Sequence, residues 1–315
     1  LLVNFRRVVT VKTLLLATII LNLGYTTLAD PDYDRGFIAY EAGDYATALR
    51  EWRPLAEQGD AQAQHNLASM YNKGEGVSAD DTEAVKWYLL AAEQGVSSAQ
   101  YNLGNAYRNG EGVNQDYSEA KKWYLLAAEQ GHAKAQYYLG MMFHHGIGTV
   151  INKADAARWY KRAAEQGIVI SQFMIAWMYQ NGEGVLKDHA DAVKWYRTAA
   201  NQGFSKAQYS LGVIYTNGEG VPEDYAEAVK WYRLAAKQGE VKAQHNLALM
   251  YHNAFGVPQD DLWAHMWLTI ASGQGDKSSD EVRGIIAESM TSADISEAQK
   301  MARECLNSKY QNCGF

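Results

Sequence analysis

The chain has 315 residues, of which 47% are hydrophobic and 21% charged, a balance that argues against disorder and against a polytopic membrane protein. Its net charge of -7 argues against broad electrostatic binding of nucleic acid. Its 2 cysteines are too few for a disulfide framework or a complete structural zinc site.

The first 29 residues have the layout of a secretory signal peptide. Three basic residues, the last of them Lys12, precede an uncharged apolar stretch, and small residues at Thr27 and Ala29 suit a cleavage site. The apolar stretch is short for a membrane span of about 20 residues. We predict cleavage near Ala29, location in the periplasm or secretion, and no stable membrane span in the mature chain. The alternative is an uncleaved N-terminal anchor.

A repeat of 36 residues runs through most of the chain. Tryptophan keeps this interval, and tyrosine follows it in five of six positions. Glycine preceded by glutamine keeps the same interval from Gly59 to Gly275, and alanine from Ala48 to Ala264. The tryptophans are Trp87, Trp123, Trp159, Trp195, Trp231 and Trp267. Columns in phase over this length indicate a tandem repeat.

One repeat shows the structure that we expect of all. Small and apolar side chains recur at three- and four-residue spacing over 97–109, which predicts a helix, and Gly110 ends it. Asp116 and Glu119 predict a capping box at the start of a second helix. Neither helix covers its apolar face alone. We therefore predict an all-α fold, an α-solenoid of stacked antiparallel helix pairs.

The repeats divide the chain into four segments. After the signal peptide at 1–29, we expect a shortened helix pair at 30–59 as an N-terminal cap, in which Pro54 interrupts the second helix. Six full repeats follow at 60–275, and residues 276–315 form C-terminal capping helices and a tail. The two capping helices are expected at 279–290 and 292–308.

The repeated residues resemble the Sel-one-like repeat family, relatives of the tetratricopeptide repeats. The signature Ala-Gln-x-x-Leu-Gly, followed by Ala-x-x-Trp-Tyr-x-x-Ala-Ala-x-Gln-Gly, stands nearly complete at 99–131 and 207–239. The resemblance covers residues 31–275. It implies an α-solenoid that mediates protein–protein contacts, often in bacterial envelopes, with the first helix of each pair lining a concave groove.

Ten side chains on these first helices form the candidate binding site. They lie in three rows that vary more between repeats than the tryptophan and glycine columns, and aromatic residues are enriched at binding hot spots. The candidates are Tyr101, Asn105, Arg108, Tyr137, Met141, His144, Phe173, Trp177, Gln180 and Tyr209. The alternative for the aromatic row is packing against the adjacent helix.

No motif in the sequence assembles a catalytic, cofactor or metal site. His144 and His145 are adjacent, so they point to different sides of a helix, and no third ligand is evident for them or for His245 and His252. The Gly-x-Gly of the loops, in which Ala254 replaces the first glycine of the sixth repeat, lacks the lysine of a phosphate-binding loop and is interpreted as a helix stop.

Two further sets of residues are predicted to be structural. The six tryptophans of the repeat are expected to lie in the core. Cys305 and Cys313 are expected to form a disulfide that clips the tail to the last helix after export, with a free thiol pair as the alternative.

Together, these patterns predict an exported, non-enzymatic scaffold that needs no cofactor. Its partner would be an envelope protein or an extended peptide bound in the groove, with regulation of a membrane sensor as a special case. The alternative is a cell-envelope glycan-binding module or hydrolase, because grooves lined by aromatic and polar side chains also suit glycans.

Overall fold

The structure is a computed structural model that describes residues 32–311, 313 and 314. The predicted signal peptide lies outside these residues. The described part of the chain contains helices and no strand, and none of these helices is both long and apolar enough to cross a membrane. The chain divides within one helix, between Ala91 and Ala92, into two compact units.

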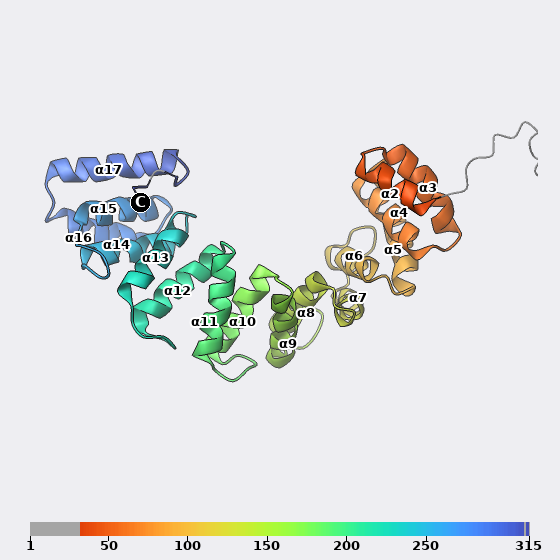
Figure 1. Ribbon diagram of the computed structural model, residues 1–315, viewed down its shortest axis with the longest axis horizontal. Coiled ribbons are helices and arrows are strands. Elements are labelled where there is room, and N and C mark those ends of the chain that lie inside the picture. Colours follow the sequence, from red (N-terminus) through yellow and green to blue (C-terminus); the bar gives the residue numbers. More distant parts are fainter. Residues whose placement is uncertain (1–31, 312, 315) are drawn as a thin grey trace, which may run out of the picture. The chain divides into compact units, whose positions relative to one another are not determined.

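The first unit contains α2, α3, α4 and most of α5 (Figure 1). Their bounds are α2 Tyr33–Glu41, α3 Tyr45–Glu57, α4 Ala61–Lys73 and α5 Asp81–Glu93. The prediction that Pro54 interrupts the second helix is wrong, because α3 continues through it. Proline lacks an amide donor, but its carbonyl still accepts from the amide of Gln58 at 3.1 Å, so the last turn of α3 is complete.

Trp52 fills the core of the first helix pair. Its side chain is 2% exposed, its Nε1 donates to the Tyr33 carbonyl at 3.1 Å, and a Cβ added at Gly36 would lie 2.4 Å from it. Trp52 is in register with Tyr88, one position after the tryptophan column. It therefore occupies the place that tyrosine takes in the full repeats.

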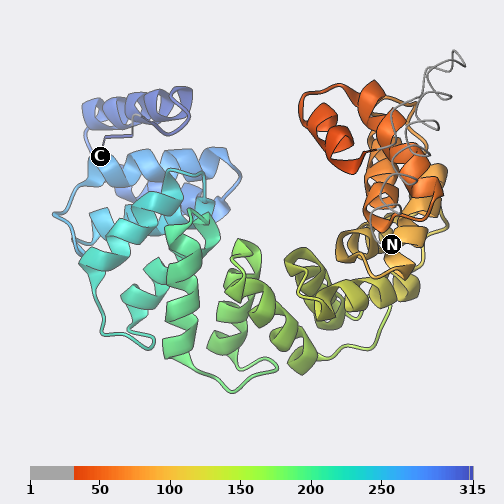
Figure 2. The ribbon, with the colours of Figure 1, turned by 45° about the vertical axis from the view of Figure 1, so that its right-hand side comes forward.

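Within the second unit the helices form a row of pairs, in which each second helix packs against the first helix of the next pair (Figures 1 and 2). The helices are α6 Ser97–Asn109, α7 Tyr117–Glu129, α8 Ala133–His145, α9 Lys153–Glu165, α10 Val169–Asn181, α11 His189–Asn201, α12 Ser205–Asn217, α13 Tyr225–Ala236, α14 Val241–His252 and α15 Asp261–Gly273. The predicted all-α solenoid of helix pairs is confirmed, and α6 has the predicted bounds.

Each second helix begins at an aspartate or asparagine, as α7 shows. The Asp116 carboxylate accepts from the amides of Ser118 and Glu119 at 2.8 and 3.0 Å. The other half of the predicted capping box does not form, because Glu119 forms an ion pair with Lys122 instead. The Asp116 amide donates to the Tyr107 carbonyl at 2.9 Å, so the end of α6 is tied directly to the start of α7.

In four helix pairs of the second unit, from α6–α7 to α12–α13, the tyrosine that follows the tryptophan lies at the centre, and in α14–α15 Leu268 takes this position. Tyr124 is 0% exposed and Tyr232 1%. The rings lie so close to the first helix that a Cβ added at Gly104 would stand 2.7 Å from Tyr124, and one at Gly212 2.4 Å from Tyr232. The small residue of the first helix is therefore required by the ring that packs on it.

The prediction for the tryptophan column needs correction. Trp159 and Trp267 are buried, at 3% and 0% exposed. The other four are only half-buried: Trp87, Trp123, Trp195 and Trp231. Consecutive side chains on a helix differ in direction by roughly 100°, so tyrosine and tryptophan cannot both face the partner helix. Tyrosine takes the inner position, and basic side chains cover tryptophan from outside, as Arg162 does at 4.8 Å from the Trp159 ring.

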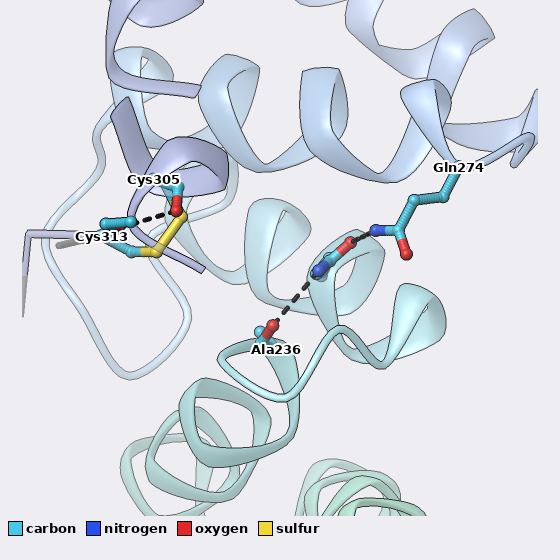
Figure 3. Close-up of a disulfide and its surroundings, with 6 residues drawn as sticks. Ala236, Gln274, Cys305 and Cys313 are labelled. Atoms are coloured by element: carbon cyan, nitrogen blue, oxygen red, sulfur yellow. Dashed lines mark hydrogen bonds between the residues drawn. A yellow bond between two sulfur atoms is a disulfide. The ribbon is translucent and has the colours of Figure 1, made fainter. Parts of the chain in front are cut away.

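A ladder of buried glutamines joins each repeat to the preceding one. Gln244 donates to the Ala236 carbonyl at 3.2 Å and accepts from Gln274 Nε2 at 2.8 Å (Figure 3). The same two bonds recur at Gln100, Gln136, Gln172 and Gln208. Both ends of each buried amide are thus satisfied, which offsets the free-energy cost of burying it.

The C-terminal segment forms α16 Lys277–Ala287 and α17 Ser292–Asn307, which packs on α15. A disulfide joins Cys305 in α17 to Cys313 in the tail, with 4.6 Å between the two Cα atoms (Figure 3). The tail passes so close to α15 that a Cβ added at Gly314 would lie 1.7 Å from the Trp263 ring.

Candidate functional site

The ten candidate side chains lie on four consecutive first helices of the second unit. Nine are half-buried and His144 is 7% exposed. We call the surface that they share the first-helix face. Tyr101, Asn105 and Arg108 lie on α6, Tyr137, Met141 and His144 on α8, Phe173, Trp177 and Gln180 on α10, and Tyr209 on α12.

The aromatic row of this face packs on the buried tyrosines. Each ring lies against the tyrosine of its own helix pair, with centroid distances of 5.6 to 6.2 Å. The pairs are Tyr101–Tyr124, Tyr137–Tyr160, Phe173–Tyr196 and Tyr209–Tyr232. Because these outer rings are also half-exposed, they both cover the core and present aromatic surface to solvent.

The hydroxyl groups of the buried tyrosines reach the first-helix face. Tyr124 donates to the Asn105 side chain at 2.6 Å, and Tyr196 donates to that of Gln180 at 2.8 Å. Burial raises the pKa of both hydroxyls, so they remain neutral donors. Two of the predicted polar candidates are therefore held in place by the core beneath them.

Tyr138 belongs to this face, although the sequence analysis did not select it. Its ring stacks on Tyr124 at 5.4 Å, and the Arg108 guanidinium lies 4.2 Å from its centre. Tyr101 stacks on His132 at 4.6 Å beside it. The signal in the sequence was the tyrosine pair at positions 137 and 138, where every other repeat has a single tyrosine, phenylalanine or histidine. Arg108 is thereby fixed over a ring by a cation–π contact.

His144 links α8 to α10. Its ring meets Trp177 edge-on at 5.9 Å, and Lys153 Nζ lies 3.1 Å from its Nε2. Lys153 also pairs with Glu183 at 3.1 Å. Burial, with the charge of Lys153, lowers the pKa of His144, so the imidazole is neutral at neutral pH and accepts from the lysine.

His245 and His252, the other histidines considered as metal ligands, each contact a different side chain. His245 Nδ1 lies 2.8 Å from the Ser279 hydroxyl, and His252 Nδ1 lies 2.6 Å from Asp261. Within the described ranges, no group of three or more His, Cys, Asp or Glu side chains is placed to hold a metal ion.

Two cavities lie beside α14, beyond the middle repeats that the sequence favoured. One is shared with α12 and α13, and the other with α12 and the start of α16. The apolar hollow, of about 250 Å³, is lined by Tyr225, Tyr232, Asn246, Leu249, Met250 and Phe255 among others. The polar hollow, of about 140 Å³, is lined by Tyr209, Lys242, His245, Asn246, Asp276 and Ser278. Asn246 lines both, so the two hollows adjoin. Of their residues, only Tyr209 is among the ten candidates.

Comparison with known proteins matches all six repeats to the same repeat family. The family model described as Sel1 repeat matches six consecutive stretches: 61–96, 97–132, 133–168, 169–204, 205–240 and 241–276. The chain is similar to the solved structure of a Sel1 repeat protein from Oxalobacter formigenes, at 37% identity and a TM-score of 0.70, over 77% of this chain and 100% of that one.

Two further similarities are more limited. A protective antigen of uropathogenic Escherichia coli with an SLR fold is 27% identical, with a TM-score of 0.48, over 88% of this chain and 85% of that one. An exopolysaccharide production negative regulator of Rhizobium leguminosarum bv. viciae is 43% identical over 53 residues. That match spans 20% of the regulator's length and 17% of this chain.

Proposed function

The chain belongs to the Sel1 repeat family, and from this premise we propose that it is a non-catalytic scaffold that binds an extended segment of another protein on its first-helix face. The observation that carries the proposal is a row of half-exposed aromatic rings on the first helices of four consecutive pairs, with ordered polar side chains beside them. Such a surface offers contact area with little side-chain entropy left to lose.

The side chains of this face favour a protein partner. Tyrosine, tryptophan and arginine are the residues most enriched at binding hot spots. Arg108 is held over Tyr138, and Trp177 is held against His144, so each is ordered before a partner arrives. The acidic net charge of the chain argues against nucleic acid as the partner.

We further propose that the scaffold acts in the cell envelope. The signal-peptide pattern of residues 1–29 and the disulfide between Cys305 and Cys313 both support export, because disulfides persist in oxidising compartments. Sequencing the N-terminus of the protein purified from cells tests this: Asp30 as the first residue supports cleavage, and retention of Arg6 and Arg7 contradicts it.

A regulatory role fits a scaffold of this kind better than catalysis. The relative described as a negative regulator of exopolysaccharide production shares one and a half repeats' length with this chain. A repeat protein can regulate by occupying a surface of its partner, which needs a binding face and no reactive groups.

The proposal is tested by crosslinking in intact cells. A photoreactive phenylalanine analogue replaces Tyr101, Tyr137 or Phe173, so that aromatic replaces aromatic. Matched controls place it at Leu126 or Leu234, exposed on second helices. We expect one protein to be captured from the first-helix positions only, and its capture to fall when Arg108→Ala and Trp177→Ala are combined.

Two outcomes would contradict the scaffold. Equal capture from Leu126 and Leu234 would place the contact elsewhere. Retention on purified cell-wall glycan that depends on Arg108 and Trp177, without a captured protein, would favour the glycan-binding alternative.

A further inference from the structure

The two hollows beside α14 have the size of single side chains. Sites for small molecules and cofactors are usually about 300 to 1,000 Å³. The hollows here are about 250 and 140 Å³ and share the wall formed by Asn246. Two adjoining cavities of this size suit a chain molecule that inserts one group into each.

The apolar hollow suits a large hydrophobic side chain. Leu249 and Met250 of α14 line it, and one wall is Tyr225 stacked on Phe255 at 4.8 Å. The polar end of Tyr232 is already satisfied, since its hydroxyl accepts from Asn246 Nδ2 at 3.1 Å. Burial of apolar surface is therefore the main contribution that this hollow offers.

The polar hollow suits a carboxylate. It is lined by Lys242, which is exposed, and no carboxylate in the described part of the chain lies within ion-pair distance of its ammonium group. The carboxylate of Asp276 in the same hollow is engaged by the amide of Ser279 at 2.9 Å and by its hydroxyl. Among the residues that the structure describes, Lys242 therefore has no carboxylate to pair with, in a protein of net charge -7.

The hollows are spaced like alternate side chains of an extended peptide. His245 in the polar hollow and Leu249 in the apolar hollow are four residues apart on α14, a rise of about 6 Å. In an extended peptide, residues two positions apart point to the same side and are about 6.8 Å apart. A peptide that runs along α14 can therefore fill both hollows at once.

We propose that the two hollows are adjoining subsites for an extended peptide that carries an acidic residue two positions from a large apolar residue. The carboxylate pairs with Lys242, the apolar side chain enters beside Leu249, and Asn246 lies between them. This inference rests on the proposed function, because it names the chemistry of the same partner next to the first-helix face, which meets the polar hollow at Tyr209.

The test pans a displayed library of random decapeptides against the exported chain. We expect enrichment of Asp or Glu two positions from Leu, Ile, Met or Phe. Lys242→Glu removes the cation, and Leu249→Trp fills the apolar hollow. Each is expected to weaken the selected peptides about tenfold. Lys206→Glu and Val213→Trp make the same changes at the equivalent positions one repeat earlier, neither of which lines either of these two hollows, and should leave binding of the selected peptides unchanged.

The outcomes separate this inference from the proposed function. Failure to enrich the pattern, or equal binding by Lys242→Glu, Leu249→Trp and the wild type, overturns the inference. If the selected peptides instead depend on Arg108 and Trp177, the scaffold stands and only the location and chemistry are wrong. If the crosslinking in cells also captures nothing, both fail. Circular dichroism spectra of the variants check that each is folded.

Discussion

Two neighbouring regions of the second unit differ in how their side chains meet. We call the part of the first-helix face on α6, α8 and α10 the filled stretch, because its large side chains contact one another, and the surface beside α12 and α14 the hollow stretch, because the two hollows lie there. In the filled stretch, Trp177 reaches His144 of the preceding repeat, and Arg108 lies over Tyr138 of the following one. In the hollow stretch, the corresponding positions of α12 are Val213 and Thr216, whose side chains are smaller.

This difference teaches that aromatic content and available volume are separate properties of a repeat surface. Large side chains on adjacent helices pack on one another, as they do around Tyr138 and Trp177, and this order stabilises the array. Smaller side chains leave volume beside Tyr232 and Leu249 that the protein itself does not fill. We expect the filled stretch to contribute more to stability and the hollow stretch more to recognition of single side chains.

The largest expected loss of stability comes from removing a buried ring in the filled stretch. Tyr160→Ala removes a ring that is 1% exposed and should cost about 3–5 kcal/mol of unfolding free energy. Tyr137→Ala removes the half-buried ring above it and should cost about 1 kcal/mol. Urea unfolding monitored by circular dichroism measures both. Tyr160→Phe is the matched control and should retain most of the stability. A negligible cost for Tyr137→Ala would show that the aromatic row serves a ligand alone.

The next effect should be equal in the two stretches. Gln172→Leu leaves the Ala164 carbonyl and the Gln202 amide without their buried partner, at an expected cost of about 2–4 kcal/mol. Gln208→Leu does the same in the hollow stretch, to Ala200 and Gln238, and should cost as much. Urea unfolding of the two variants side by side is the measurement. A cost confined to one of them would mean that the ladder does not act equally in every repeat.

A smaller and more local effect is expected at the end of the array. Replacing Cys305 and Cys313 by serine opens a nine-residue loop, which should cost about 2–3 kcal/mol. Hydrogen exchange should rise in α17 and the tail, while α8 and α9 in the filled stretch remain protected. Reduction of the wild-type disulfide should reproduce the pattern. Faster exchange throughout the second unit would contradict a local role.

The fold was predictable because the same signals recur from repeat to repeat: apolar spacing, a residue that ends the first helix and a cap that begins the second. Apolar spacing and Gly110 gave the bounds of α6, and the Asp116 cap gave the start of α7. The family resemblance was confirmed over six repeats. What the pattern did not decide was which of two adjacent aromatic columns faces inward. Tyr124 is buried and Trp123 half-buried, and this follows from the close approach of Gly104, a contact that sequence spacing does not contain.

The sequence predicted which helices carry the candidate residues, but it did not predict which side chains these residues contact. The rows containing Tyr101 and Asn105 were assigned to the first helices, where they lie. The glutamine ladder joins residues that are 30 positions apart, such as Gln100 and Gln130. The sequence shows that glutamine recurs in each repeat, but it does not show that these two side chains form a hydrogen bond. A hollow is a property of what neighbouring side chains leave unfilled. No residue type marks it, and for that reason Asn246 and Lys242 were not selected.

The smallest expected effect distinguishes the two stretches by pH. Burial lowers the pKa of His144 in the filled stretch below its ordinary value near 6.5, so the unfolded chain binds the proton more readily. The stability that depends on neutral His144 is complete above pH 6.5 and is lost as the pH falls below it. In the hollow stretch, hydrogen bonds from Ser279 lower the pKa of Asp276, and the nearby His245 lowers it further. The stability that depends on ionised Asp276 is complete above its ordinary pKa near 3.9 and is lost only in more acid solution.

Urea unfolding between pH 8 and pH 5 should therefore show a shallower decline in stability for His144→Phe than for the wild type, and no such change for Asp276→Asn. The other histidines with lowered pKa are present in all three proteins, so they cancel in the comparison. An equal decline in the wild type and His144→Phe would mean that the imidazole is not held neutral by its place between α8 and α10.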